Sequence, residues 1–306
     1  MDPTTKLPDT PKRAIHLYLQ LTVAFSAVVW TFIIWSGHLY MGFGLMIPAI
    51  MWCPGLAAFI ACRKLSRDLR SIGWSWPKNR YVVAAYCVPL AYSSIAYGAV
   101  WIGHLGGWNS EFVSQVSQGF GLPGLPEWGS LTLYILTMST GGMILNLSTA
   151  LGEEIGWRGL LVPELAKRMS FTKVGILSGI IWAAWHAPLL LFTDYHVGTK
   201  RGYALACSTV AVVSASFILA WLRLKSDSVW APAVFHASYN VFVPGVFDNL
   251  IRNTGSTLWY TTEFGAALAI TSAVFAFYFW TRRSEVEPRR TESVQIALAP
   301  QLVADQ

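Results

Sequence analysis

The chain has 306 residues, of which 54% are hydrophobic and 12% are charged. Soluble domains carry about 25% charged residues, so this composition argues against a soluble protein and for one embedded in a membrane. The formal net charge of +6 would also suit a nucleic-acid-binding protein. The placement of the basic residues therefore has to decide between these two classes.

Eight apolar runs are long enough for membrane-spanning helices, which need about 20 mostly apolar residues each. In chain order they cover residues 14–36, 40–62, 81–103, 131–155, 172–193, 203–222, 229–247 and 258–280. Between the third and fourth runs, residues 112–116 suggest a short interfacial helix. We therefore predict an all-α, polytopic transmembrane helix bundle with about eight spans. The polar tail 284–306 is expected to be disordered.

Basic residues flank these runs unevenly. If the N-terminal segment 1–13 is cytoplasmic, 19 of the 22 Lys and Arg residues lie in cytoplasmic segments, and only Lys200, Arg201 and Arg252 lie outside. Cytoplasmic loops of membrane proteins are enriched in basic residues, so both termini are predicted to be cytoplasmic. Basic residues that flank membrane segments in this way favour membrane lipid over nucleic acid as a partner. The compact chain with short loops indicates the plasma membrane of a prokaryote.

Two adjacent acids, Glu153 and Glu154, lie at the end of the fourth run. Ionisable residues within membrane segments are costly and suggest a function. Arg158 follows Glu154 by four residues, so these two side chains meet on one helical face, whereas Glu153 is turned about 100° away. The spacing predicts an ion pair between Glu154 and Arg158 and leaves Glu153 as a general base. Considered alone, the acids are equally compatible with a salt-bridge cluster at the membrane edge.

Two histidines lie inside later runs. His186 lies deep in the fifth run and His236 in the seventh, where Asn240 shares the helical face of His236. Each histidine could be a hydrogen-bonded packing residue, and His236 with Asn240 could be an interhelical pair. With Glu153, however, they supply a base for water and donors for an oxyanion, which amide hydrolysis requires.

The depth of these residues constrains the fourth helix. If it ended at Glu154, Glu153 would lie at the membrane surface, far from His186. If it continues to residues 163–168, Glu153 lies about 15 Å inside, at a depth similar to that of His236. We therefore predict that the fourth helix continues past Glu154.

These motifs resemble those of the CPBP family, intramembrane proteases that include the type II CAAX prenyl endopeptidases and the bacterial Abi or bacteriocin self-immunity proteins. The family pattern is EExxxR, FxxxH and HxxxN, which appears here at residues 153–158, 182–186 and 236–240. Trp182 replaces the Phe of the second motif, and we expect this to change only the shape of the pocket. The resemblance covers roughly residues 130–247. It defines a predicted catalytic core at 129–247, between helices in 14–128 and a last helix in 248–283.

The resemblance implies a role for each residue. Glu153 would activate the attacking water, which His186 would help to hold. His236 and Asn240 would stabilise the oxyanion of the tetrahedral intermediate. The remaining motif residues, Glu154 and Arg158, would support this group, and no cofactor is favoured.

A zinc ion is the alternative to this metal-free mechanism. Glu153, His186 and His236 could form a His₂Glu set of the kind that zinc peptidases use, although the sequence contains no HExxH motif. We favour the glutamate-dependent mechanism because the HxxxN motif places two hydrogen-bond donors on one helical face.

The expected function is that of an intramembrane endopeptidase whose active site opens to the cytoplasm. Its substrate would be a peptide or a lipidated protein, with CAAX prenyl-protein processing as one option. The alternative is a non-proteolytic membrane immunity or peptide-binding protein on the same scaffold. A transporter is less favoured, because the sequence shows no internal repeat.

Overall fold

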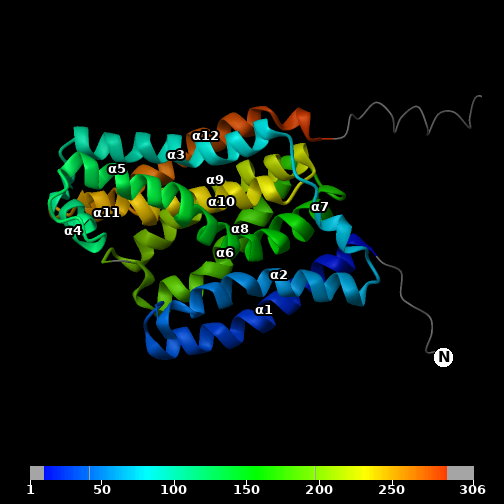
Figure 1. Ribbon diagram of the computed structural model, residues 1–306. Coiled ribbons are helices and arrows are strands. Elements are labelled where there is room, and N and C mark those ends of the chain that lie inside the picture. Colours follow the sequence, from blue (N-terminus) through cyan, green and yellow to red (C-terminus); the bar gives the residue numbers. More distant parts are fainter. Residues whose placement is uncertain (1–9, 41, 197, 288–306) are drawn as a thin grey trace, which may run out of the picture.

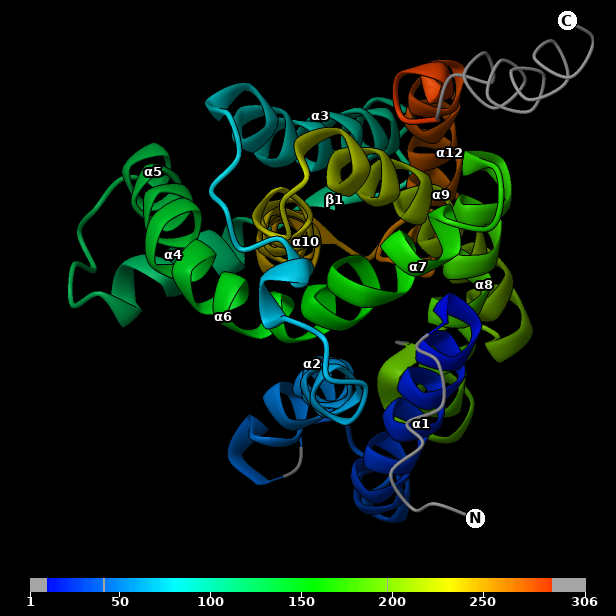
Figure 2. The same ribbon diagram turned by 90° about the vertical axis from the view of Figure 1, so that its right-hand side faces the viewer.

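The computed structural model describes residues 10–287 except residues 41 and 197. These residues form a helical bundle (Figure 1), which confirms the predicted all-α class. Their one sheet is a two-stranded antiparallel ladder that pairs β1 (Gly107–Trp108) with β2 (Ile251–Arg252). Figure 2 shows α10 (Trp230–Phe242) end-on near the middle of the bundle, where it packs against α3 (Asn79–Ile102), α6 (Met143–Glu154) and α9 (Arg201–Ser226).

Six helices among the described residues are long and apolar enough to cross a membrane. They are α1 (Pro11–Ser36), α2 (Met46–Lys64), α3 (Asn79–Ile102), the continuous helix Glu127–Ala166, α8 (Phe171–Phe192) and α9 (Arg201–Ser226). The last two predicted spans are shorter helices. α10 continues through a π-helical turn, η6 (Val243–Phe247), into α11 (Asp248–Leu250), and α12 covers Ala266–Thr281. Each of the eight predicted runs thus contains a helix, although only six of the described helices reach full spanning length.

The fourth helix is a rod of 40 residues. It consists of α5 (Glu127–Thr137), η3 (Met138–Gly142), α6 (Met143–Glu154), η4 (Ile155–Leu161) and α7 (Val162–Ala166), where η3 and η4 are π-helical. The prediction that this helix continues past Glu154 is confirmed. Its predicted end at residue 155 was too early, because a π turn reorients the backbone without ending the helix.

Small residues let this rod approach α2 closely. A Cβ atom on Gly156 would lie 2.5 Å from the Tyr18 hydroxyl and 2.6 Å from Cβ of Pro54. A Cβ atom on Gly152 would lie 2.8 Å from the ring of Trp52. Glycines allow such near-contact of helices in membrane bundles. This contact fixes the part of the rod that carries the two glutamates.

The last span begins later than the sequence predicted. Residues 258–280 were expected to be helical, but Thr257–Trp259 form a 3₁₀ turn and α12 begins only at Ala266. Thr262 has a φ of +64° and lies in the turn before α12. Glu263 therefore precedes the helix instead of lying five residues inside it. The expected interfacial helix is present as α4 (Ser110–Gly119), whereas most of the tail predicted to be disordered lies outside the described residues.

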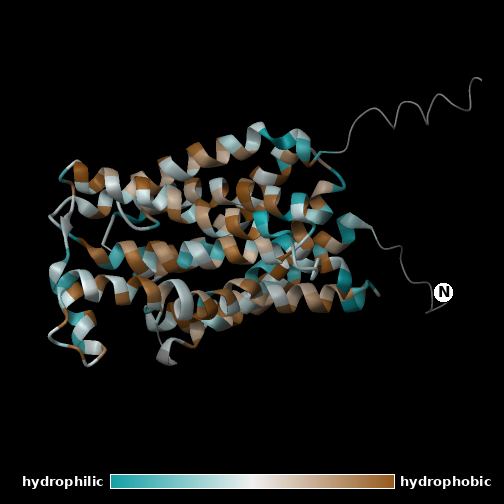
Figure 3. Cartoon of the chain, turned by 45° about the horizontal axis from the view of Figure 1, so that its top comes forward, coloured by the Kyte–Doolittle hydropathy of each residue, from teal (hydrophilic) through white to brown (hydrophobic). Residues whose placement is uncertain are grey.

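One end of the bundle is basic. Arg63 and Lys64 lie in the last turn of α2, and Arg223 and Lys225 in the last turn of α9. Figure 3 shows hydrophilic residues concentrated at the end where α1 begins and α12 stops. This arrangement fits the positive-inside pattern.

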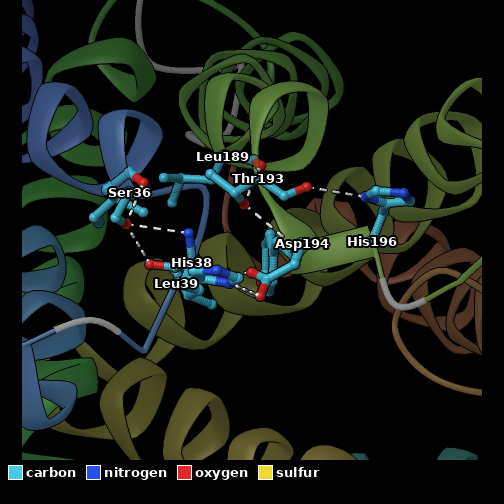
Figure 4. Close-up of polar contacts among 9 residues, drawn as sticks. Ser36, His38, Leu39, Leu189, Thr193, Asp194 and His196 are labelled. Atoms are coloured by element: carbon cyan, nitrogen blue, oxygen red, sulfur yellow. Dashed lines mark hydrogen bonds and ion pairs between the residues drawn. The ribbon is translucent and has the colours of Figure 1, made fainter.

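At the opposite end a polar contact ties α1 to α8. His38 follows α1, and Asp194 begins the 3₁₀ turn η5 (Asp194–His196) after α8. The His38 Nδ1 lies 2.8 Å from Asp194 Oδ2, and the Leu39 N–H donates to Asp194 Oδ1 at 3.1 Å (Figure 4). The hydrogen bond from His38 lowers the pKa of Asp194 below its ordinary value. This contact, called here the His38–Asp194 clasp, joins α1 to α8. Both helices pack against the rod that carries the two glutamates.

Candidate active site

Four ionisable side chains form a buried group where the rod meets α10. Glu153 and His236 are 2% and 7% exposed, and Glu154 and Arg158 are fully buried. The acids come from the last turn of α6, the arginine from η4 and the histidine from α10. The alternative interpretation, a salt-bridge cluster exposed at the membrane edge, does not fit side chains that are this deeply buried.

The Glu153 carboxylate is held by two indole groups. Its Oε2 accepts hydrogen bonds from Trp157 Nε1 at 3.1 Å and from Trp182 Nε1 at 2.7 Å. No Lys or Arg of the described residues forms an ion pair with Glu153, and its Oε1 makes no hydrogen bond to them. Hydrogen bonds that donate to a carboxylate stabilise its ionised form. Glu153 is thus fixed through one oxygen atom while the other stays unengaged.

Glu154 points to another side of the helix and contacts an arginine and a histidine. Its Oε1 lies 2.9 Å from Arg158 Nη1 and 2.9 Å from His236 Nδ1. Arg158 also donates to Ser216 Oγ at 3.2 Å. The predicted ion pair between Glu154 and Arg158 is present. The contact between Glu154 and His236 was not predicted.

The two histidines are oriented by their Nδ1 atoms. His186 Nδ1 lies 3.0 Å from the carbonyl oxygen of Trp182, and His236 Nδ1 lies against Glu154. A carbonyl oxygen can only accept, so His186 must carry a proton on Nδ1, which leaves Nε2 as an acceptor in the neutral ring. Asn240 is half-buried one turn beyond His236, and its carboxamide makes no hydrogen bond to the other described residues.

Trp182 connects these groups. Its ring centroid lies 5.7 Å from that of His186 and 5.4 Å from that of His236, both edge-on, and the Arg158 guanidinium lies 4.2 Å above the ring. The expectation that Trp182 only changes the pocket shape is wrong, since its indole N–H bonds directly to Glu153. The structure thus gathers three of the predicted catalytic side chains around one tryptophan.

The sequence analysis also missed Trp157. This residue lies four positions after Glu153, which is the spacing at which helical side chains meet. Its role in holding Glu153 was therefore detectable from the sequence. The bond from Trp182 was not, because it depends on how α8 packs against the rod.

The side chains that the structure describes do not form a ready-made metal site. Among residues 10–287, outside the two omitted positions, no three His, Cys, Asp or Glu side chains lie close enough together to hold a metal ion. No step proposed below involves a metal.

Comparison with known proteins agrees with these motifs. Residues 136–242 match the model of the family described as type II CAAX prenyl endopeptidase Rce1-like. The match includes all six predicted site residues. The central segment of the chain is therefore similar to this family. Within the matched segment the first motif lies on α6 and η4, the second on α8 and the third on α10.

One curated relative is the CAAX prenyl protease 2 of Methanococcus maripaludis. It is 30% identical over 103 residues, which are 32% of this chain. The match spans 38% of the relative's length. The likeness therefore concerns the matched segment and not the whole of either protein.

Proposed function

We propose that this protein is an intramembrane endopeptidase in which Glu153 activates a water molecule. The observation that carries the proposal is the division between the two glutamates. Glu154 is engaged by Arg158 and His236, whereas Glu153 is buried, held by two indole groups and has no cationic partner among the described residues. A general base needs a fixed carboxylate with one accessible oxygen. Glu153 Oε1 meets this requirement.

His186 is suited to hold the water molecule. With Nδ1–H bonded to the Trp182 carbonyl, the neutral ring presents the Nε2 lone pair, which can accept a hydrogen bond from water. Glu153 would take a proton from this water as it attacks the peptide carbonyl. The same carboxyl would then give the proton to the leaving amine.

His236 is suited to the oxyanion role when it is doubly protonated. Charge counting supports this state, because Glu153, Glu154 and Arg158 alone carry a net charge of −1. An imidazolium at His236 makes the buried cluster neutral, and burying an uncompensated charge is costly. With Nδ1–H on Glu154, the Nε2–H becomes a donor. The Asn240 carboxamide would supply a second donor to the oxyanion.

The substrate class follows from the family and the setting of the site. The relative's name describes a prenyl protease acting on CAAX sequences, and the site lies within a bundle of apolar helices. We infer that the substrate is a lipidated protein whose C-terminal peptide enters from the basic, cytoplasmic side. The membrane would be the plasma membrane of a prokaryote.

Substitution of Glu153 by Gln in proteoliposomes tests the mechanism. We expect cleavage of a prenylated C-terminal peptide to fall by about 10²- to 10⁴-fold, which is the usual contribution of a positioned base. Glu164→Gln is a matched control, because Glu164 lies on the same rod, is 4% exposed and pairs with Arg67 and Lys167 away from the site. Undiminished cleavage by Glu153→Gln would refute the mechanism. Tight peptide binding by the native protein with no cleavage would favour the immunity or peptide-binding alternative.

A further inference from the structure

A groove of about 700 Å³ lies between α3, α9 and α12, and none of the predicted site residues lines it. Its volume falls in the range that ligand pockets occupy. The groove forms because α12 packs against both α9 and α3, whereas α3 packs mainly on α10 and barely touches α9. Figures 1 and 2 show these three helices on one side of the bundle. The mechanism proposed above does not use this groove.

The floor of the groove is aromatic, and apolar side chains line its wall. Tyr81, Trp221 and Phe279 are buried in its floor, with ring centroids 6.3 Å apart for Tyr81 and Trp221 and 5.2 Å apart for Trp221 and Phe279. Val274 on the wall is 63% exposed, like other apolar side chains on the outward face of α12. From Val88 back to Arg80, near the start of α3, the wall extends about 12 Å. Such a wall suits a hydrocarbon chain.

The mouth of the groove is cationic. Arg80, Lys225 and Arg282 line it with Glu285, which pairs with Lys225 at 3.1 Å and with Arg282 at 2.6 Å. Arg80 has no carboxylate partner among the described residues. Its guanidinium lies 4.7 Å above the Tyr81 ring and donates to the Tyr81 hydroxyl at 2.8 Å. Three cations and one carboxylate leave a charge of +2 on side chains that are already held in place.

We infer that this groove binds an anionic glycerophospholipid, with the phosphate among Arg80, Lys225 and Arg282 and one acyl chain over the aromatic floor. Basic pockets between membrane helices on the cytoplasmic side attract anionic headgroups. Arginine and lysine form charge-assisted hydrogen bonds with phosphate oxygens. A zwitterionic lipid carries its own ammonium group, which these cations would repel. A free prenyl chain has no negative charge to engage them.

Lipid retention measured by native mass spectrometry tests this inference. The full chain is exchanged into an equimolar mixture of phosphatidylglycerol and phosphatidylcholine, and the ratio of the two retained lipids is counted. We expect a clear preference for phosphatidylglycerol in the native protein. The preference should fall roughly tenfold in Arg80→Gln/Lys225→Gln, because each basic residue near an anionic headgroup strengthens its binding.

The matched control is Arg168→Gln/Lys173→Gln, which removes two exposed cations from the same end of the bundle but outside the groove. This control should keep the native preference. Equal losses in both double variants, or no preference in the native protein, would overturn the inference. Displacement of the bound phosphatidylglycerol by geranylgeraniol would also overturn it, since the groove would then take a prenyl chain. Arg80→Gln alone, with an intermediate ratio expected, keeps the test valid if the double variant does not fold.

Discussion

The hydrogen bond from Trp182 to Glu153 offers the sharpest test of the proposed base. The perturbation is replacement of Trp182 by 3-benzothienylalanine, an isostere with sulfur in place of the indole N–H. The ring keeps its contacts with His186, His236 and Arg158. Only the 2.7 Å hydrogen bond to Glu153 is removed. Phenylalanine, the residue of the family pattern, is a second variant without the N–H.

The expected loss can be worked from the bond itself. Hydrogen bonds to charged groups contribute about 1.5–3 kcal/mol, and about 1.4 kcal/mol corresponds to tenfold in rate. A bond needed to orient the base would therefore lower kcat by about 10- to 150-fold. Trp157 still donates to the same oxygen at 3.1 Å, so we expect a loss near tenfold. KM should stay within about twofold, because Trp182 acts through Glu153 and not through binding of the substrate.

Steady-state cleavage of a prenylated peptide in proteoliposomes gives kcat and KM for each variant. The same replacement at Trp185 is the control. Trp185 lies on the same helix and touches His186 at 4.8 Å between ring centroids, but its indole N–H donates to Ser26. We expect kcat of the Trp185 variant to stay close to native. An unchanged kcat at Trp182, in a protein that Glu153→Gln inactivates, would refute the orienting role. Equal losses at both tryptophans would indicate a general packing effect.

Three further predictions concern the cluster, the helix contact and the clasp. Arg158→Met should lower the free energy of unfolding by about 3–5 kcal/mol, because it leaves a buried carboxylate short of a cation; thermal unfolding in detergent measures this. Gly156→Ala should cost about 1–3 kcal/mol through overpacking against α2, whereas Gly141→Ala, with no atom within 4 Å of the new Cβ, should be nearly neutral. The clasp should stabilise the fold above the ordinary pKa of Asp, and this increment should disappear as the pH falls through the lowered pKa of Asp194. Because both partners are more than half exposed, we expect under about 1 kcal/mol, seen as a difference in Tm between native protein and Asp194→Asn that is full at pH 7 and shrinks as the pH falls through the lowered pKa of Asp194.

Much of the architecture could be predicted from hydrophobic run length and charge placement. Each of the eight runs contains a helix, and the depth argument correctly extended the fourth helix past Glu154. The start of α12 could not be predicted, because residues 257–265 are apolar enough to continue a helix. A 3₁₀ turn and the left-handed conformation of Thr262 end that continuity instead. Apolar composition specifies burial, but it does not specify where the backbone turns.

Within the site, contacts along one helix could be predicted and contacts between helices could not. The pair of Glu154 and Arg158 and the reach of Trp157 to Glu153 both follow from a separation of four residues. The contact of Glu154 with His236 spans 82 positions in the chain, and that of Glu153 with Trp182 spans 29. Both depend on which faces of α8 and α10 are turned towards the rod. A single sequence does not contain that information.

The adjacency of the two glutamates has a geometric reason. Successive helical side chains diverge by about 100°, so two adjacent residues of the rod can contact two different neighbouring helices. Glu153 bonds to Trp182 on α8, while Glu154 pairs with His236 on α10. Arg158 contacts both groups, since it pairs with Glu154 and its guanidinium stacks on the Trp182 ring. Moving either acid by one position would turn it away from its partner helix, so the spacing of the EExxxR motif follows from the packing of the rod between α8 and α10.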